Sequence, residues 1–225
     1  MSTRPALPFA GYGIRCARPA ESGAVAALLA SAFADDPVMA WMIPDASDRE
    51  RRIARYFRLA QRRQRPRAGG VRVAATAEGR LLAAALWTRP GRWKASAVQE
   101  LAALPQYARV FGLRGLPRAG EVENAMTEAH PGTPHWYLPT VGTDPGLQGT
   151  GVGTALLLQQ LADCDRLGQP AYLESSKAAN VPFYEGLGFR VTGELRLPRG
   201  GPAVWPMWRE PRPADASETG ERGVA

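Results

Sequence analysis

The stretch that decides the fold is DPGLQGTGVGTALLLQQLADC, residues 144–164. Gly149, Gly151 and Gly153 stand at alternate positions directly before a run with the composition of a helix. The first amides of a helix have no carbonyl partner within it and carry partial positive charge, so they bind anions. Glycine lacks the β-carbon that would keep a phosphate group away from the backbone. The segment therefore predicts a phosphate cradle at the start of a helix.

Two common phosphate loops and one ligand-free alternative compete for this segment. A Walker A loop needs Lys and then Ser or Thr after its last glycine, whereas Gly153 is followed by Thr154 and Ala155. A dinucleotide fingerprint needs a glycine where Thr154 or Leu156 stands, although an acid, Glu174, does follow about twenty residues later. A glycine-softened turn that binds nothing is the structural alternative.

A third cradle, Q/R-x-x-G-x-G/A, fits the segment from Gln148 to Gly153. With the lead-in WYLPTVGTDPGLQGTGVG (136–153) and a second block, YLESSKAANVPFYEGLGFRV (172–191), the sequence resembles the GNAT superfamily of N-acetyltransferases. The second block contains the N-x-x-F/Y-Y-x-x-x-G-F pattern of that family. Two ordered blocks at the expected separation are far more specific than one glycine motif. AFADDP, LESS and PFYEGLGF are also similar to the puromycin N-acetyltransferase subgroup.

The resemblance implies where coenzyme A binds. The glycine segment embraces the pyrophosphate, and two central strands splay apart to leave a slot for the pantetheine arm. Backbone groups of Val141 and Thr143 contact this arm, and the amide of Val141 is the candidate donor to the acetyl oxygen. The mid-strand glycine of TVGT fits a close backbone approach or a bulge. The implied cofactor-binding residues are Val141, Gly142, Thr143, Gln148, Gly149, Thr150, Gly151, Val152, Gly153, Thr154, Asn180, Phe183 and Tyr184.

The resemblance also implies one catalytic residue, and the sequence offers candidates for a second. The family places a tyrosine on the short helix after the fifth strand, where Tyr184 stands, and a phenol suits protonation of a leaving thiolate. A core aromatic is the structural alternative. Glu174 is the candidate base, directly or through water. Asp35 and Asp36 are candidates to attract a substrate ammonium, but Asp-Asp-Pro is also an ordinary helix end. His135 is a weaker candidate base.

The predicted elements alternate as in a single α/β domain with a mixed, splayed central sheet flanked by helices. We expect this domain over residues 1–210 and a disordered tail over 211–225. The predicted strands are 70–76, 80–88, 135–143, 168–176, 189–197 and 203–209, after a short strand that leads into a helix start over 12–22. The predicted helices are 23–37, 48–67, 95–130, one that follows the glycine segment and ends near 167, and 180–188. We expect 70–76 and 80–88 to form a hairpin, the strands before and after the helix that ends near 167 to pair in parallel, and the last two strands to form an antiparallel hairpin. The long helical region 95–130 should break near Pro105 and around 112–117.

Charge and composition exclude several classes of protein. The net charge of +7 is carried almost wholly by arginine, which fits biased base composition as well as an anionic ligand. Two distant cysteines and two histidines show no metal-ligand spacing, so no metal is expected, and structural roles are favoured for all four residues. No transmembrane run or secretory signal is present, so we expect a cytoplasmic protein that does not bind membranes. A nucleic-acid partner is not expected.

The sequence therefore predicts an acetyl-CoA-dependent N-acetyltransferase that acts by direct transfer, as a monomer or a homodimer. The expected acceptor is a primary amine of a small molecule, with an antibiotic-like amine as one candidate. The alternatives are a protein or peptide amine acetyltransferase and a non-catalytic acyl-CoA-binding module.

Overall fold

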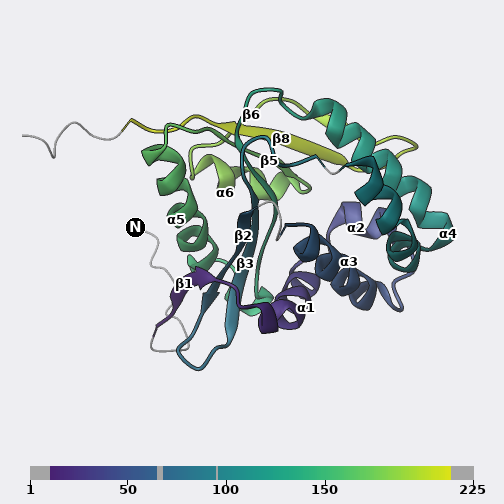
Figure 1. Ribbon diagram of the computed structural model, residues 1–225, viewed down its shortest axis with the longest axis horizontal. Coiled ribbons are helices and arrows are strands. Elements are labelled where there is room, and N and C mark those ends of the chain that lie inside the picture. The colour runs from purple at the N-terminus through teal and green to yellow at the C-terminus, as the bar shows by residue number, and fades with distance from the viewer. Residues whose placement is uncertain (1–10, 65–67, 95, 214–225) are drawn as a thin grey trace, which may run out of the picture.

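The structure is a computed structural model that describes residues 11–64, 68–94 and 96–213 (Figure 1). The predicted tail lies outside the described residues from 214 onward. The elements are β1 (Gly13–Cys16), η1 (Pro19–Glu21), α1 (Ser22–Ala32), α2 (Pro37–Met42), α3 (Arg49–Gln64), β2 (Ala68–Ala75), β3 (Leu81–Thr88), α4 (Ala97–Ala129), β4 (Trp136–Thr143), η3 (Pro145–Leu147), α5 (Val152–Arg166), β5 (Ala171–Ser175), η4 (Ala178–Asn180), α6 (Val181–Glu185), β6 (Arg190–Val191), β7 (Leu195–Arg196) and β8 (Ala203–Arg209).

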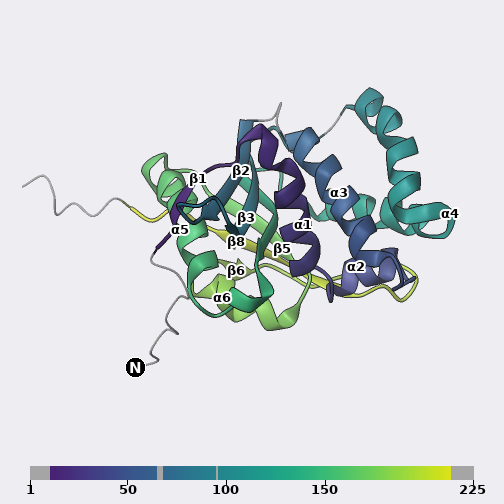
Figure 2. The same ribbon diagram turned by 90° about the horizontal axis from the view of Figure 1, so that it is seen from below.

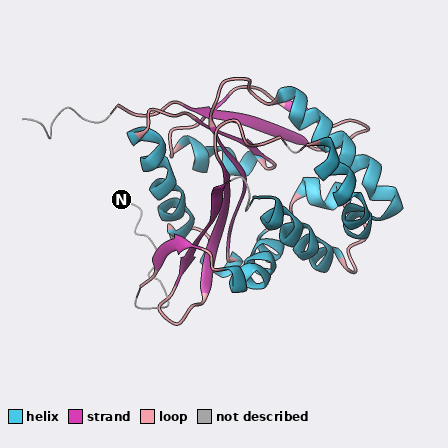
Figure 3. Ribbon diagram, in the orientation of Figure 1, coloured by secondary structure: helices cyan, strands magenta, loops and turns pink. Residues whose placement is uncertain are grey.

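A mixed sheet runs through the molecule in the order β1-β2-β3-β4-β5-β8-β6, with β7 paired to β8. Among the strands of the described residues, only β4 and β5 pair in parallel, as expected for two strands joined by the crossover helix α5. The predicted hairpin of β2 and β3 and the antiparallel C-terminal strands are confirmed. The predicted mixed α/β fold with helices on both sides of the sheet is therefore confirmed (Figure 3).

Two hydrophobic cores form, one on each face of the sheet. The helices α1 to α4 cover one face, and α5 and α6 cover the other (Figures 1 and 2). Strand β3 supplies both cores because its side chains alternate, with Leu86 in the α1–α4 core and Trp87 in the α5–α6 core. Every residue of β3 is buried, as expected for a central strand with both faces covered.

The helix α4 lies across the outer side of α2 and α3 (Figure 1). The predicted break around 112–117 is confirmed at Gly112. This residue has a non-helical backbone conformation inside α4, with a φ of 67°. The predicted break at Pro105 is wrong, since the helix continues through it. A proline removes one helical hydrogen bond, but burial of Ala103 and Val110 on either side of it holds the helix against the core.

The segment predicted as one strand over 189–197 forms two short strands instead, β6 and β7, because the chain bends between them. Both pair with β8, whose Arg209 side chain is 2% exposed. This guanidinium makes two hydrogen bonds of 2.7 Å to the carboxylate of Asp165 at the end of α5. The pair ties the last strand to the crossover helix.

Within the described ranges, no helix combines the length and hydrophobicity needed to cross a membrane.

Candidate active site

The two central parallel strands part after a short paired stretch. β4 and β5 are in register only at Trp136 with Ala171 and at Tyr137 with Tyr172. Beyond this point the two strands separate, and a cavity of about 920 Å³ has lining residues from both strands. The same cavity is lined by Phe57 of α3 on one face and by Tyr184 of α6 on the other. The gap between the strands therefore joins the two faces of the sheet.

The glycine segment forms one end of this cavity. Gly149 and Gly151 have φ values of 77° and 89°, which L side chains rarely adopt, and Gly151 is the N-cap of α5. The first hydrogen bond of the helix runs from the Ala155 amide to the Gly151 carbonyl, at 3.0 Å. The amides before Ala155 have no acceptor inside the helix and stand at the end of the cavity.

Not every residue of the predicted cradle faces the cavity. Gln148, Gly149, Gly151, Gly153 and Thr154 line it, and the structure brings all five together.

The other two residues of the segment have structural roles. The Thr150 hydroxyl donates to the Leu147 carbonyl at 2.6 Å and holds the turn, whereas the Val152 side chain is fully buried in the α5–α6 core. Neither residue belongs to the lining of the cavity.

Two glycines allow elements to approach closely. A β-carbon on Gly153 would lie 2.8 Å from the Thr143 hydroxyl oxygen, so this glycine lets the start of α5 meet the end of β4. A β-carbon on Gly142 would lie 2.9 Å from side-chain carbons of both Ala32 and Leu29. The mid-strand glycine predicted from TVGT thus serves a close approach, and the approaching group is the helix α1.

The short helix α6 contributes the predicted phenol. Tyr184 is 8% exposed and lines the cavity together with Asn180 and Phe183. Its ring packs edge-on against Phe183 and Phe189. Burial, and then the charge of Asp36, raises the pKa of the Tyr184 phenol, which therefore stays protonated at neutral pH. Asn180 ends η4 immediately before α6.

Glu174 lies at the point where the strands part. Its side chain is 3% exposed, and its Oε1 atom is buried without a hydrogen-bond partner. The nearest cation-forming group is the His130 side chain, 2% exposed, with Nδ1 at 3.8 Å from that oxygen. Both residues line the cavity. Burial, and then the Glu174 carboxylate, raises the pKa of the phenols of Tyr137 and Tyr172.

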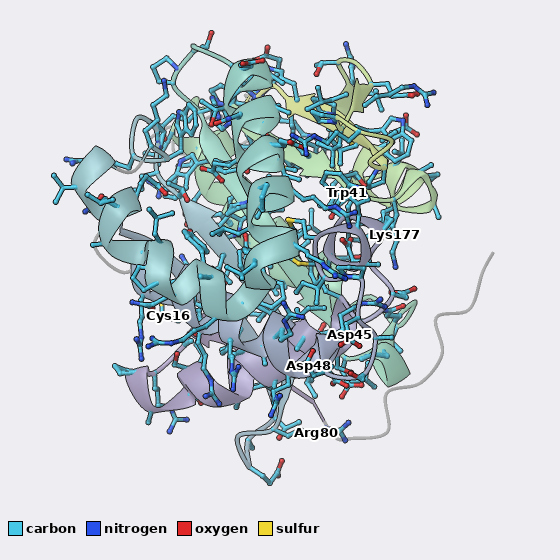
Figure 4. All side chains as sticks on the ribbon, turned by 90° about the vertical axis from the view of Figure 1, so that its right-hand side faces the viewer. Cys16, Trp41, Asp45, Asp48, Arg80 and Lys177 are labelled. Carbon is cyan, nitrogen blue, oxygen red and sulfur yellow. The ribbon has the colours of Figure 1, made fainter. Side chains whose placement is uncertain are left out.

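The predicted candidates Asp35 and Asp36 already have partners in the chain. The Asp36 carboxylate caps α2 by accepting from the Met39 amide at 2.9 Å, and it also accepts from the Ser176 hydroxyl. Lys177 donates to Asp35 at 2.6 Å. Lys177 is marked in Figure 4, which looks onto the α4 side of the molecule. The Asp-Asp-Pro turn therefore begins α2 and ties the end of α1 to the loop after β5, although both acids line the cavity.

Comparisons with known proteins agree with this geometry. Residues 127–210, less than half of the chain, match the model of the acetyltransferase (GNAT) domain. A solved structure from Corynebacterium glutamicum, described as histone acetyltransferase HPA2 and related acetyltransferase, is 29% identical with a TM-score of 0.70, and the match covers 91% of this chain and 99% of that one. The fold is that of the GNAT acetyltransferases.

Two further relatives extend the comparison. The polyamine N-acetyltransferase of Drosophila melanogaster shares the GNAT fold, with 18% identity, a TM-score of 0.59 and coverage of 88% of this chain and 99% of that one. A curated protein of Schizosaccharomyces pombe, described as an uncharacterized N-acetyltransferase, is 38% identical over 86 residues, which are 37% of this chain and 34% of that protein. The chain thus matches about a third of the length of this curated relative. Together the comparisons support a GNAT-superfamily acetyltransferase.

Within the GNAT fold, the structure places most predicted site residues around one cavity and adds one that the sequence did not indicate. Val141, Gly142 and Thr143 line the cavity from β4. His135 is buried at the start of β4 and is absent from the lining. His130 was expected to be structural, yet it stands beside Glu174. These two residues are far apart in the sequence, and no local motif connects them. Within the described ranges, no group of three acidic, His or Cys residues is placed to hold a metal ion.

Proposed function

We propose that the chain transfers an acetyl group from acetyl-CoA directly to a primary amine of a small molecule. The observation that carries this proposal is the cavity that passes between β4 and β5, with the glycine segment at one end and Tyr184 at its wall. A GNAT fold alone does not identify an acceptor, because one fold hosts many reactions. The site geometry is therefore the basis of the proposal.

The residues present fit coenzyme A. The positive φ angles of Gly149 and Gly151 and the free amides at the start of α5 suit a pyrophosphate, which a β-carbon at either glycine would crowd. Beyond its two paired residues, the edge of β4 that faces β5 is available to an amide-bearing arm such as pantetheine. Bound there, acetyl-CoA supplies the acetyl group as an activated thioester.

Three residues of the chain are assigned to the reaction. The amide of Val141 donates to the acetyl oxygen, where negative charge develops. The Tyr184 phenol, kept protonated by its raised pKa, supplies a proton to the leaving thiolate. Glu174 accepts the proton that the amine loses, directly or through water. The new C–N bond thus replaces the C–S bond without a net change in protons.

Neither cysteine of the chain is placed to form an acyl-enzyme. Cys16 is exposed on β1, and Cys164 is buried on α5. Neither belongs to the lining of the cavity, which supports transfer within a ternary complex. Burial also raises the pKa of the Cys164 thiol to about 12, so little nucleophilic thiolate forms at neutral pH.

A small-molecule acceptor is favoured because the cavity is lined by α2, α3 and α4 on the face opposite the glycine segment. The similarity of AFADDP and PFYEGLGF to the puromycin N-acetyltransferase subgroup supports an antibiotic-like amine as one acceptor. Solved relatives are described as histone and polyamine acetyltransferases, so protein amines and polyamines are the main enzymatic alternatives.

The test is a thiol-release assay with acetyl-CoA and a panel of amines that includes puromycin, a polyamine and a lysine peptide. Tyr184→Phe should lower kcat by about 100-fold or more while the Kd of acetyl-CoA stays unchanged. Tyr12→Phe is the matched control, since Tyr12 lies outside the cavity lining and the same hydroxyl is removed. An unchanged kcat in Tyr184→Phe contradicts the acid role. Binding of acetyl-CoA without thiol release for any amine identifies an acyl-CoA-binding module instead.

A further inference from the structure

The part of the cavity on the α1–α4 face has an unusual charge for this chain. The chain contains 28 basic residues, all arginine except Lys94 and Lys177. Nevertheless, no arginine occurs among the described residues that line the cavity, and the one lining lysine, Lys177, is paired with Asp35. Five carboxylic acids line it: Asp35, Asp36, Glu100, Glu123 and Glu174. Coenzyme A is an anion, so this excess of acids suits a cationic second ligand.

One oxygen atom among these acids lacks a hydrogen-bond donor, although the phenols of Tyr137 and Tyr172 interact with the same carboxylate. Glu174 Oε1 is a buried acceptor without a hydrogen-bond partner, and a buried carboxylate in that state is costly. The His130 ring lies beside it, with Nδ1 3.8 Å from this oxygen. Whether His130 can supply the missing donor depends on its tautomer.

The contacts of His135 determine that tautomer. His135 Nδ1 lies 2.6 Å from the Thr133 carbonyl oxygen, which can only accept, so Nδ1 carries the hydrogen. Burial lowers the pKa of His135, and in the neutral ring Nε2 is therefore an acceptor. His135 Nε2 lies 3.0 Å from His130 Nε2, which must then be the donor. In a neutral His130 this leaves Nδ1 without a hydrogen.

Glu174 Oε1 and His130 Nδ1 thus face each other with lone pairs, at a distance too long for a hydrogen bond. A donor with at least two N–H groups satisfies both atoms at once. A primary ammonium placed about 2.8 Å from each atom spans a separation of 3.8 Å without strain. A carbonyl or an anion at the same place adds a third acceptor and is disfavoured.

Much of the cavity wall on the α1–α4 face is apolar. Phe33, Met39, Tyr56, Phe111 and Met126 line the cavity on the α1–α4 face. Trp93 lines it too and stacks on the His130 ring with centroids 3.6 Å apart. Aromatic and thioether side chains favour an apolar body. The other four lining acids already have partners within the chain, so a second ammonium group finds no unpaired acceptor like Glu174 Oε1 among them.

We propose, on the basis of the function proposed above, that the acceptor is a monoamine with an aromatic or other bulky apolar body, and that its ammonium is held by Glu174 Oε1 and His130 Nδ1. His135 is the positioning residue, since it sets the tautomer of His130. Glu174 then takes one proton from the ammonium and passes it to solvent, and the neutral amine attacks the acetyl carbon. The second proton that the nitrogen loses as the C–S bond breaks is taken up by Glu174 or water, and it balances the proton that Tyr184 gives to the leaving thiolate.

The first experiment detects the ammonium site without any reaction. The chain has two histidines, so ¹⁵N spectra of the full chain resolve both rings, and His130→Gln assigns them. We expect His135 as the Nδ1–H tautomer and His130 as the Nε2–H tautomer. In the absence of acetyl-CoA, phenethylamine should shift the His130 Nδ1 signal, whereas 2-phenylethanol, which has the same shape but no charge, should leave it in place. An Nδ1–H tautomer at His130, or equal shifts with both ligands, overturns the proposal.

The second experiment compares ligands and variants by calorimetry. Phenethylamine should bind at least about tenfold more tightly than putrescine or a lysine peptide, and Glu174→Gln should weaken its binding about tenfold or more. Glu185→Gln is the matched control, because Glu185 is exposed on α6 and absent from the cavity lining. Both variants should bind acetyl-CoA like the unchanged protein.

The outcomes separate this proposal from the function on which it depends. If phenethylamine binds tightly and this binding needs Glu174, but no thiol is released from acetyl-CoA, the ammonium site is supported and the proposed acetyl transfer is contradicted. Thiol release with a polyamine or a lysine peptide, together with weaker binding of phenethylamine, supports acetyl transfer and overturns the acceptor class. Binding of phenethylamine that is the same in Glu174→Gln as in the unchanged protein also overturns it.

Discussion

Replacing Gly142 by alanine tests how closely α1 is packed on β4 beside the cavity. The new β-carbon would lie 2.9 Å from the Ala32 Cβ and 2.9 Å from the Leu29 Cδ2. The Ala32 Cβ cannot move unless the backbone of α1 moves, and Leu29 is fully buried. Overpacking of this kind costs about 1–3 kcal/mol. Loss of glycine freedom in the unfolded chain returns about 0.5–1 kcal/mol, so a net loss of up to about 2.5 kcal/mol is expected.

The matched control is Gly13→Ala in β1 of the same sheet, where a β-carbon would have no atom within 4 Å. This variant gains the entropy contribution without the clash, so its stability should stay equal or rise by up to about 1 kcal/mol. Urea unfolding of both variants measures the two free energies, and the midpoint should shift without a change in slope. If Gly142→Ala is as stable as Gly13→Ala, α1 does not approach β4 as the structure shows.

Three further outcomes test other parts of the molecule. At pH 8 a thiol reagent should label Cys16 alone, because burial raises the pKa of Cys164 to about 12 and suppresses its thiolate; mass spectrometry should find Cys164 labelled only after unfolding. Asp165→Asn should cost about 3 kcal/mol in thermal or urea unfolding, since it leaves the buried Arg209 without its counter-charge. The pKa of Glu21 is lowered to about 2 by hydrogen bonds from an arginine of β1, so Glu21→Gln should lose up to about 1 kcal/mol at pH 7. That loss should disappear as the pH falls through about 2, and a difference that persists there contradicts the pairing.

The sequence predicted the parts of the molecule that short-range physics determines. Alternate glycines before a helix predicted a turn with bare backbone, and in the structure Gly149 and Gly151 of this turn have positive φ angles. The turn between β2 and β3 was likewise visible in the local pattern. The break at Gly112 followed from the glycines and proline around it. The break expected at Pro105 does not occur, because neighbouring residues of the helix pack into the core, and a local sequence pattern does not contain that contact.

The pairing of Glu174 with His130 was not predictable in the same way. It depends on where the end of α4 meets the start of the gap between β4 and β5, which is a tertiary contact. The tautomer of His130 depends in turn on a carbonyl of the following loop. The reason for Gly142 was also hidden, because the sequence indicates a close approach but not which element approaches.

The gap between β4 and β5 has a kinetic consequence. Because residues from both faces of the sheet line the passage, the reaction proposed above lets acetyl-CoA and the amine approach from opposite sides and meet in the middle. If the two reactants bind as proposed, neither blocks the entrance of the other, so neither has to arrive first. An inert amine analogue should then act as a noncompetitive inhibitor against acetyl-CoA, and the spent coenzyme can leave while the next amine is already in place.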